Sequence, residues 1–294
     1  MGDELVWVNG DLVPASEARI SVYDQGFLYG YGLFETMRSY DGKLFLLDEH
    51  MARLARGAAA IGLDAKLKDA DLAAACRETV RANGGGGLRV RLTVTGGDAP
   101  GFPWEGNTRP PTVVIIARTF ESYPPERYER GYRACIASVC RCAESAVAGI
   151  KSVNYLVTVM ARREAAALGF DESILLSDRG TVAEGGNTNV FFVRDGRLLT
   201  PALDTGILAG ITRDLVRDLA RETGVPYQEA ELRPEDLSGM DEAFFTSSVI
   251  EVMPLVSVRL TDGKTVTFNE GKPGEVTRRL MAAYADRVRR ETGG

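Results

Sequence analysis

The stretch AVAGIKSVNYL, residues 146–156, contains the only lysine between Lys68 and Lys264, and it runs into a predicted helix over residues 155–168. Such a lysine has two interpretations. It is either a surface residue beside a helix start or an amine shielded from water. Burial lowers the pKa of an amine, so the neutral nucleophile becomes available to form a Schiff base. The local sequence leaves both interpretations open for Lys151.

A second informative stretch is TVAEGGNTNVFF, residues 181–192, in which Glu184 precedes two glycines and an apolar strand. One interpretation is a solvated acidic turn. The other is a carboxylate held by tight backbone against a cationic partner in a closed site.

Two further stretches could bind phosphate. GILAGITR, residues 206–213, is a glycine-bracketed loop that enters a helix, where free backbone N–H groups and a threonine hydroxyl suit an anion. It lacks the spacing of a nucleotide P-loop, and an ordinary helix start is the alternative. FTSSVIEVMP, residues 245–254, places small hydroxyl residues at a strand end, where they either bind phosphate or only terminate the strand.

The composition excludes several classes of protein. The chain has 294 residues, a formal charge of −6 and a pI near 5.1, which argues against partners such as nucleic acid or an anionic membrane. The acidic N-terminus is unlike a secretory signal, so we expect a cytoplasmic protein. Four cysteines and a single histidine make a disulfide framework or a zinc site a poor hypothesis. We therefore predict no metal, and thiols that serve as packing residues.

The hydrophobic patterning predicts a mixed α/β (α+β) fold in two domains. Asp-Gly between apolar runs predicts a hairpin over residues 34–47, and strict alternation predicts a strand over residues 88–95. The proline-containing residues 121–130 are interpreted as an interdomain linker. We expect a small N-terminal α/β domain over residues 1–120 and a larger C-terminal domain over residues 131–294.

Five segments, taken in order, carry a resemblance to a known family. They are EHMAR at residues 49–53, KSVNY at 151–155, Glu184 with Asn189, GIT at 210–212, and Ser248 with Glu251 and Pro254. Together they closely resemble the class IV (fold type IV) pyridoxal-phosphate enzymes, as does DQGFLYGYGLFE at residues 24–35. That family includes branched-chain aminotransferases, D-amino acid aminotransferases and aminodeoxychorismate lyases. The resemblance extends from about Val8 to Arg279.

The resemblance implies pyridoxal 5′-phosphate (PLP) as cofactor, held in an interdomain cleft, and a homodimer. Lys151 would form the Schiff base with PLP and then move the proton between the substrate Cα and the cofactor. Glu184, in the C-terminal domain with Lys151, would pair with the protonated pyridine nitrogen. Tyr155 would donate to the phenolic oxygen, and Leu208 would pack on the ring. The phosphate would be held, mostly within that domain, by Arg53, Ile211, Thr212 and Ser248. Asn189 would brace the loop of Glu184, and His50 would be structural.

The implied activity is ping-pong amino transfer between an amino acid, branched-chain-like or glutamate, and a 2-oxo acid. The alternatives are an aminodeoxychorismate lyase that releases pyruvate and 4-aminobenzoate, and a D-amino acid aminotransferase. A non-enzymatic binding protein fits less well, since Lys151, Tyr155 and Glu184 are all present.

The resemblance says less about the substrate pocket. Branched-chain aminotransferases have Tyr-x-Arg where this chain has Arg89-Val90-Arg91, and D-amino acid aminotransferases have Arg-x-His where it has GGDAPGF, residues 96–102. The candidate substrate residues are Tyr29, Phe34, Arg89, Arg91 and Val249. The arginines could clamp a carboxylate or be solvated, the two aromatic residues could instead be core, and Val249 would act through its backbone.

Overall fold

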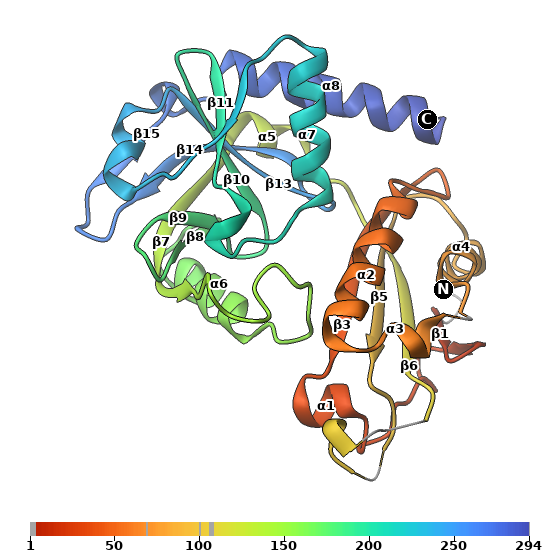
Figure 1. Cartoon of the computed structure of the whole chain (residues 1–294). Coiled ribbons are helices and arrows are strands. Elements are labelled where there is room, and N and C mark those ends of the chain that lie inside the picture. Colours follow the sequence, from red (N-terminus) through yellow and green to blue (C-terminus); the bar gives the residue numbers. More distant parts are fainter. Residues whose placement is uncertain (1–3, 69, 100, 106–108, 294) are drawn as a thin grey trace. The chain divides into compact units, whose positions relative to one another are not determined.

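The computed structural model describes residues 4–68, 70–99, 101–105 and 109–293 (Figure 1). The chain forms two compact units, each with its own sheet and helices, and the mixed α+β class is confirmed. The first unit contains the residues up to Glu121 together with Ile150–Asn154 and the residues from Val288 onward. The second contains Ser122–Gly149 and Tyr155–Arg287.

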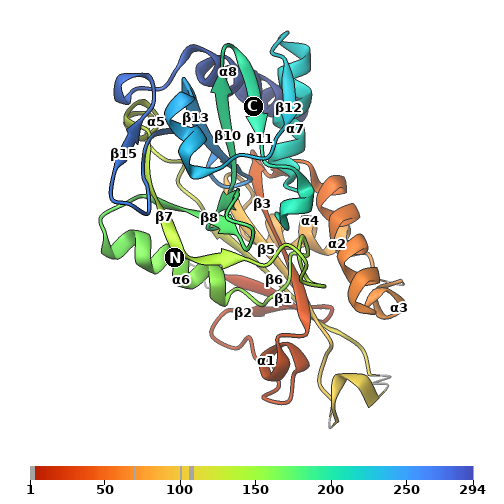
Figure 2. The same cartoon turned by 60° about the vertical axis from the view of Figure 1, so that its left-hand side comes forward.

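The first unit is an antiparallel sheet covered by helices on one face. Its strands are β1 (Leu5–Val8), β2 (Asp11–Pro14), β3 (Gly32–Tyr40), β4 (Lys43–Leu44), β5 (Leu88–Thr95) and β6 (Thr112–Thr119), in the order β2-β1-β6-β5-β3-β4. Its helices are α1 (Gln25–Tyr29), α2 (Leu47–Ile61), α3 (Asp64–Leu67) and α4 (Leu72–Ala82), with a 3₁₀ turn η1 (Pro103–Glu105). Both views place α2 and α4 on the same side of the sheet (Figures 1 and 2).

The core of this unit follows from alternation along its strands. Leu88, Val90, Leu92 and Val94 of β5 are all buried against residues of α2 and α4. The predicted strand over residues 88–95 is therefore confirmed, because every second side chain can enter the core. The predicted hairpin is confirmed as well, since its Asp-Gly turn has both residues at positive φ. Its second strand is shorter than predicted, because α2 already begins at Leu47.

Ile150–Asn154 join the first unit through the edge of β3. The amide of Phe34 donates to the carbonyl oxygen of Lys151 at 3.0 Å, and the amide of Val153 donates to that of Gly32 at 3.0 Å. Leu33 and Ser152 also form a β-bridge. The predicted domain boundaries grouped Lys151 with residues 131–294. Its segment differs from that grouping because backbone hydrogen bonds tie it to a strand far earlier in the chain.

The second unit is built on a mixed sheet. Its strands are β7 (Tyr132–Arg141), β8 (Glu172–Ser177), β9 (Val182–Gly185), β10 (Asn189–Arg194), β11 (Arg197–Thr200), β12 (Tyr227–Glu229), β13 (Glu242–Ser247), β14 (Glu251–Arg259) and β15 (Thr265–Thr267). The order is β12-β11-β10-β13-β14-β7-β8-β9, and β15 pairs with β14. The helices are α5 (Pro125–Arg130), α6 (Leu156–Ala167), α7 (Ile211–Glu222) and α8 (Glu275–Thr292), with 3₁₀ turns η2 (Leu203–Thr205), η3 (Pro234–Gly239) and η4 (Asn269–Gly271). The last residues of α8, from Val288 onward, belong to the first unit.

Two features of the second unit differ from expectation. Most of the predicted linker is helical, because α5 begins with Pro125 at a position where proline is favourable. Cys76, in the first unit, and Cys135 are buried, whereas Cys140 and Cys142 are exposed. The packing prediction is therefore wrong for the last two thiols.

Within the described ranges, no helix is both long and apolar enough to cross a membrane. Nor do the same residues include any group of three histidine, cysteine or acidic side chains that could hold a metal ion.

Candidate functional site

Lys151 lies beside an aromatic ring in the first unit. Its Nζ is 4.6 Å from the centroid of the Phe34 ring, and Phe34 is 3% exposed. Lys151 is itself partly buried. Of the two interpretations of this lysine, an open surface residue is excluded.

The same ring contacts a second cation. The Cζ atom of Arg91 on β5 is 3.9 Å from the Phe34 centroid. The structure thus brings two predicted residues, Arg91 of β5 and Lys151 of the segment Ile150–Asn154, to the ring of a third, Phe34 of β3. Arg89 lies two residues back on the same face of β5, opposite Arg38, and its side chain is exposed.

Arg53, the predicted phosphate ligand on α2, is held by a carboxylate of β3. Arg53 Nε donates to Glu35 Oε1 at 2.8 Å, and Arg53 Nη2 donates to Glu35 Oε2 at 2.6 Å. The Nδ1 atom of His50 lies 2.7 Å from Glu35 Oε2. Because residues three apart share a helix face, His50 and Arg53 approach the carboxylate together.

Burial and charge determine the ionisation of this group. Burial raises the pKa of Glu35, but the hydrogen bonds from Arg53 and His50 outweigh it and lower the pKa to about 2. Burial also lowers the pKa of His50, although the bond to Glu35 opposes this shift. At neutral pH the group therefore comprises a carboxylate, a guanidinium and a neutral imidazole. This fits the prediction that His50 has a structural role.

In the second unit, Glu184 lies on β9 and is 5% exposed. Its Oε2 accepts the amide of Leu208 at 3.1 Å, and its Oε1 is 2.8 Å from Arg141 Nε. The carboxylate is thus fixed by a backbone donor and a cation. The interpretation of Glu184 as a solvated acidic turn is wrong, because the residue is buried and its oxygens are bonded.

Asn189 connects this carboxylate to the start of α7. Its Nδ2 donates to the carbonyl oxygen of Leu208 at 2.9 Å, so Asn189 braces the loop that bonds Glu184. A Cβ atom on Gly210 would lie only 1.9 Å from Asn189 Oδ1. Glycine is therefore required at residue 210 for the loop to pass this close.

The first turn of α7 carries the other predicted phosphate ligands of this loop. Ile211 and Thr212 are its first two residues, and both are buried. The N-cap, Gly210, has no side chain to accept from the first amides. An uncapped helix start with a threonine hydroxyl is a suitable place for an anion.

Ser248 and Val249 lie in the turn between β13 and β14, where they are partly buried. The amide of Val249 donates to Ser247 Oγ at 3.4 Å, and the amide of Ile250 donates to the same oxygen at 3.3 Å. The backbone prediction for Val249 thus falls on a turn organised by a serine hydroxyl. Tyr155 is the N-cap of α6 and is partly buried.

Tyr29, at the end of α1, belongs to an exposed aromatic cluster of the first unit. Its ring centroid is 6.0 Å from that of Phe102, and Phe102 stacks on Trp104 at 4.5 Å. Trp104 is 75% exposed and Phe27 is 69% exposed. We call Tyr29, Phe102 and Trp104 the aromatic patch.

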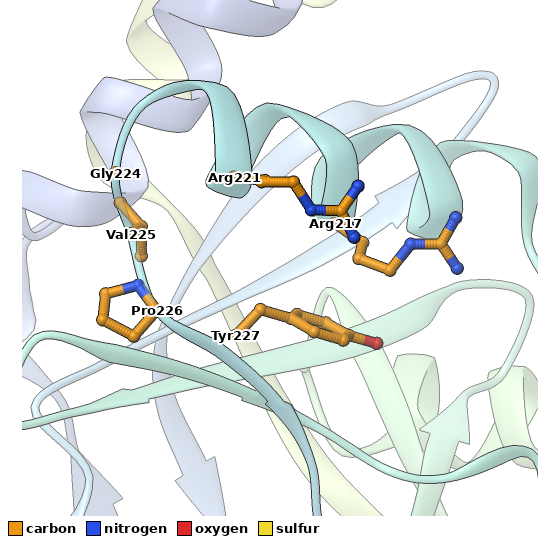
Figure 3. A pocket seen from close by; sticks show the side chains of 6 residues that line it. All are labelled: Arg217, Arg221, Gly224, Val225, Pro226 and Tyr227. Atoms are coloured by element: carbon orange, nitrogen blue, oxygen red, sulfur yellow. The ribbon is translucent and has the colours of Figure 1, made fainter.

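A cavity of about 340 Å³ in the second unit is a poor candidate for the site (Figure 3). Figure 3 shows Arg217 and Arg221 of α7 near Tyr227. Both arginines already pair with aspartates of the same helix, Arg217 with Asp214 and both with Asp218. Their charge is therefore compensated, and none of the predicted site residues lines this cavity.

Two residues of the site were not predicted. Glu35 could have been found, because alternation along β3 places it on the core face between Leu33 and Met37, where an acidic side chain needs a buried cation. Arg141 has no such signal. It reaches Glu184 only because β7 and β9 both pair with β8.

Comparison with known proteins shows the family to which this chain is related. The family model described as "Amino-transferase class IV" matches residues 32–258. A Methanocaldococcus jannaschii protein, provisionally named a branched-chain-amino-acid aminotransferase, is 37% identical over 96% of this chain and 95% of its own. The D-alanine aminotransferase of Bacillus licheniformis is 36% identical over 98% of both chains.

Among solved structures, the branched-chain amino acid aminotransferase of Thermobaculum terrenum in its PLP form has a TM-score of 0.83 and 29% identity, covering 97% of this chain and 94% of that one. The matched family region begins at β3, whose residues Glu35 and Phe34 bond Arg53 and Lys151, and it ends within β14, beyond Glu184 and the turn at Ser248. Because the family model matches residues 32–258 and two relatives above 30% identity cover almost the whole chain, the chain belongs to the class IV aminotransferases.

Proposed function

We propose that this enzyme transfers an amino group between an amino acid and a 2-oxo acid by a ping-pong reaction with PLP. The observation that carries the proposal is the position of Lys151 Nζ and Arg91 Cζ at one phenyl ring, 4.6 and 3.9 Å from its centroid. An amine beside a guanidinium fork suits a substrate whose reacting carbon bears a carboxylate.

The chemistry of the available donors fits PLP. Arg53 and the uncapped start of α7 with Thr212 suit its phosphate, and Ser248 supplies a further hydroxyl. Glu184, fixed by Leu208 and Arg141, suits a protonated ring nitrogen. The solved relative in its PLP form supports the same cofactor.

Each residue has a definite task in this proposal. When bound, PLP supplies an electron-withdrawing ring that stabilises negative charge at the substrate Cα. Lys151 binds the aldehyde and, once released, carries the proton from Cα on its Nζ. Glu184 keeps the ring nitrogen protonated, Tyr155 donates to the phenolic oxygen, and Leu208 packs against the ring.

We further propose a branched-chain-like amino acid or glutamate as donor. Arg91 and the absence of Arg-x-His from the sequence of residues 96–102 favour this choice over a D-amino acid. Of the predicted pocket residues, Phe34 would line the site, whereas Arg89 is exposed and Tyr29 belongs to the aromatic patch. Val249 would act through the backbone of its turn.

The test is a panel of L- and D-amino acids offered with 2-oxoglutarate or pyruvate, with the visible absorbance of the cofactor followed in each half-reaction. We expect branched-chain L-amino acids with 2-oxoglutarate to give glutamate. Turnover of D-alanine alone would make the enzyme a D-amino acid aminotransferase. Release of pyruvate and 4-aminobenzoate from aminodeoxychorismate, without amino transfer, would make it a lyase.

We also propose a homodimer. The support is the aromatic patch, because exposed rings of this size usually mark a surface that another protein covers. Sedimentation of Trp104→Ser against the unchanged protein tests this. We expect the variant to dissociate at higher concentration, and equal dissociation would exclude the aromatic patch from the interface.

A further inference from the structure

Two neighbouring residues of β3 hold two different parts of the proposed PLP site. Phe34 binds the backbone of Lys151 through its amide and contacts the ammonium group with its ring. Glu35 comes next, and its side chain lies on the other face of the strand, where it accepts both hydrogen bonds from Arg53. The strand thus fixes the residue for the aldehyde and a residue for the phosphate in one rigid register.

Glu35 holds Arg53 by geometry as well as by charge. Its two oxygens engage Nε and Nη2 of the guanidinium at 2.8 and 2.6 Å, which fixes the plane of the group. Glu35 is 1% exposed and the Arg53 side chain is 10% exposed, so water offers little competition. The remaining edge of the guanidinium, with Nη1, has its direction determined by this fork.

The charges of Glu35 and Arg53 allow attraction by charge to be distinguished from orientation of the guanidinium. With a neutral His50, the negative Glu35 cancels the positive Arg53, so the group contributes little net charge. If Arg53 attracted phosphate by charge alone, removal of the charge of Glu35 would strengthen phosphate binding. If orientation is what matters, the same removal weakens binding, because the released side chain must be ordered again.

We propose that Glu35 is a positioning residue that orients the Arg53 guanidinium toward the cofactor phosphate; this rests on the proposed function. Glu35 itself touches neither cofactor nor substrate. We therefore expect the loss of Glu35 to lower the affinity only for ligands that carry the phosphate. The loss of a merely structural residue would lower the affinity for all ligands alike.

The experiment compares PLP with pyridoxal, which lacks the phosphate. Apoenzyme of the unchanged protein and of Glu35→Gln is titrated with each ligand, and binding is followed by absorbance. Glutamine keeps one acceptor but loses the charged fork, so we expect PLP affinity to fall about tenfold while pyridoxal affinity stays within about twofold. An equal loss for both ligands, or tighter binding of PLP, would overturn the proposal.

A second variant protects the test against misfolding. Arg53→Lys keeps the positive charge and cannot form the fork, so we expect the same selective loss of PLP affinity. Adding Glu35→Gln to that variant should then change the PLP-to-pyridoxal ratio little. A full further loss would mean that Glu35 acts independently of Arg53, which also overturns the proposal.

The matched control is Glu242→Gln. Glu242 is a buried carboxylate of the second unit that accepts the amides of Val276 and Thr277, and we expect the ligand ratio to remain unchanged. The unchanged protein and Glu35→Gln together distinguish failure of the proposed function from failure of the proposed role of Glu35. If the unchanged protein binds neither ligand, the proposed function fails. If it binds both and Glu35→Gln keeps its ratio, only the role of Glu35 fails.

Discussion

Glu184 accepts the amide hydrogen of Leu208 at 3.1 Å, although 24 residues separate them along the chain. The bond ties the carboxylate of β9 to the loop that leads into α7. Asn189 holds the same loop through the carbonyl of Leu208. Hydrogen bonds thereby connect the Glu184 carboxylate, Leu208 and the start of α7, so we expect a change in one to affect the others.

Glu184→Gln tests the charge of this carboxylate. The amide oxygen can still accept from Leu208, but it cannot keep a ring nitrogen protonated, so we expect kcat to fall about 100-fold with PLP still bound. Half-reaction spectra measure this loss. Glu222→Gln, at an exposed ion pair with Arg287, is the control, and equal activity of both variants would contradict the assignment.

Lys151→Ala tests the nucleophile. We expect turnover to fall about 10⁴-fold, because both the covalent link and the proton carrier are removed, and the Schiff-base absorbance to disappear. The measurement is a spectrum of the purified variant with added PLP. Full activity would exclude Lys151 from the reaction.

Arg91→Gln tests the carboxylate fork. Loss of charge-assisted hydrogen bonds should lower kcat/KM by about 10- to 100-fold, chiefly through KM for both amino acid and 2-oxo acid. The matched control on the neighbouring strand is Arg118→Gln, since Arg118 is exposed and pairs with Glu4. A comparable loss for Arg89→Gln would show that both arginines take part.

Gly210→Ala tests the close approach at the start of α7. The added Cβ would collide with Asn189 Oδ1, so the loop must shift and we expect PLP affinity to fall about fivefold. Gly239→Ala is the control, because an added Cβ there has no neighbour within 4 Å. Unchanged affinity in Gly210→Ala would mean that the helix start does not hold the phosphate.

The buried group at Glu35 predicts acid sensitivity of the fold. Because the pKa of Glu35 is lowered from 4.5 to about 2, its contribution to stability is complete above about pH 5 and is lost as the pH falls toward 2. The full effect is about 3 kcal/mol. His50 acts in the same direction from about pH 6.5 downward, since burial lowers its pKa and the unfolded chain takes up the proton more readily.

Denaturant unfolding between about pH 7 and pH 3 measures this effect. In Glu35→Gln the unfolding free energy should be lower at neutral pH and should depend less on pH. A variant whose pH dependence matches that of the unchanged protein would show that other carboxylates dominate acid unfolding.

The parts of the fold that sequence predicts well are those with a local period. β5 is an example, because its alternation reports directly which side chains face the core. β14 and α8 were not predicted. All but the end residues of β14 are buried, so it shows no alternation, and it contains Pro254, which disfavours a strand assignment.

The candidate site divides in the same way. Lys151, Glu184 and Thr212 could be predicted from the sequence because each lies in an unusual local context that also matches a family pattern. The partner of Glu184 at Arg141, and the strand that holds Lys151, depend on pairings between distant segments. Local periodicity contains no information on such pairings, so only the structure could provide them.

The pairing of Ile150–Asn154 with β3 also bears on synthesis. A ribosome that has released only the residues up to Glu121 has made every strand of the first sheet but not the edge segment that carries the lysine. A fragment cut at that boundary would therefore expose the vacant edge of β3 to pairing with other chains. We therefore expect the first unit to aggregate when it is expressed without the segment Ile150–Asn154.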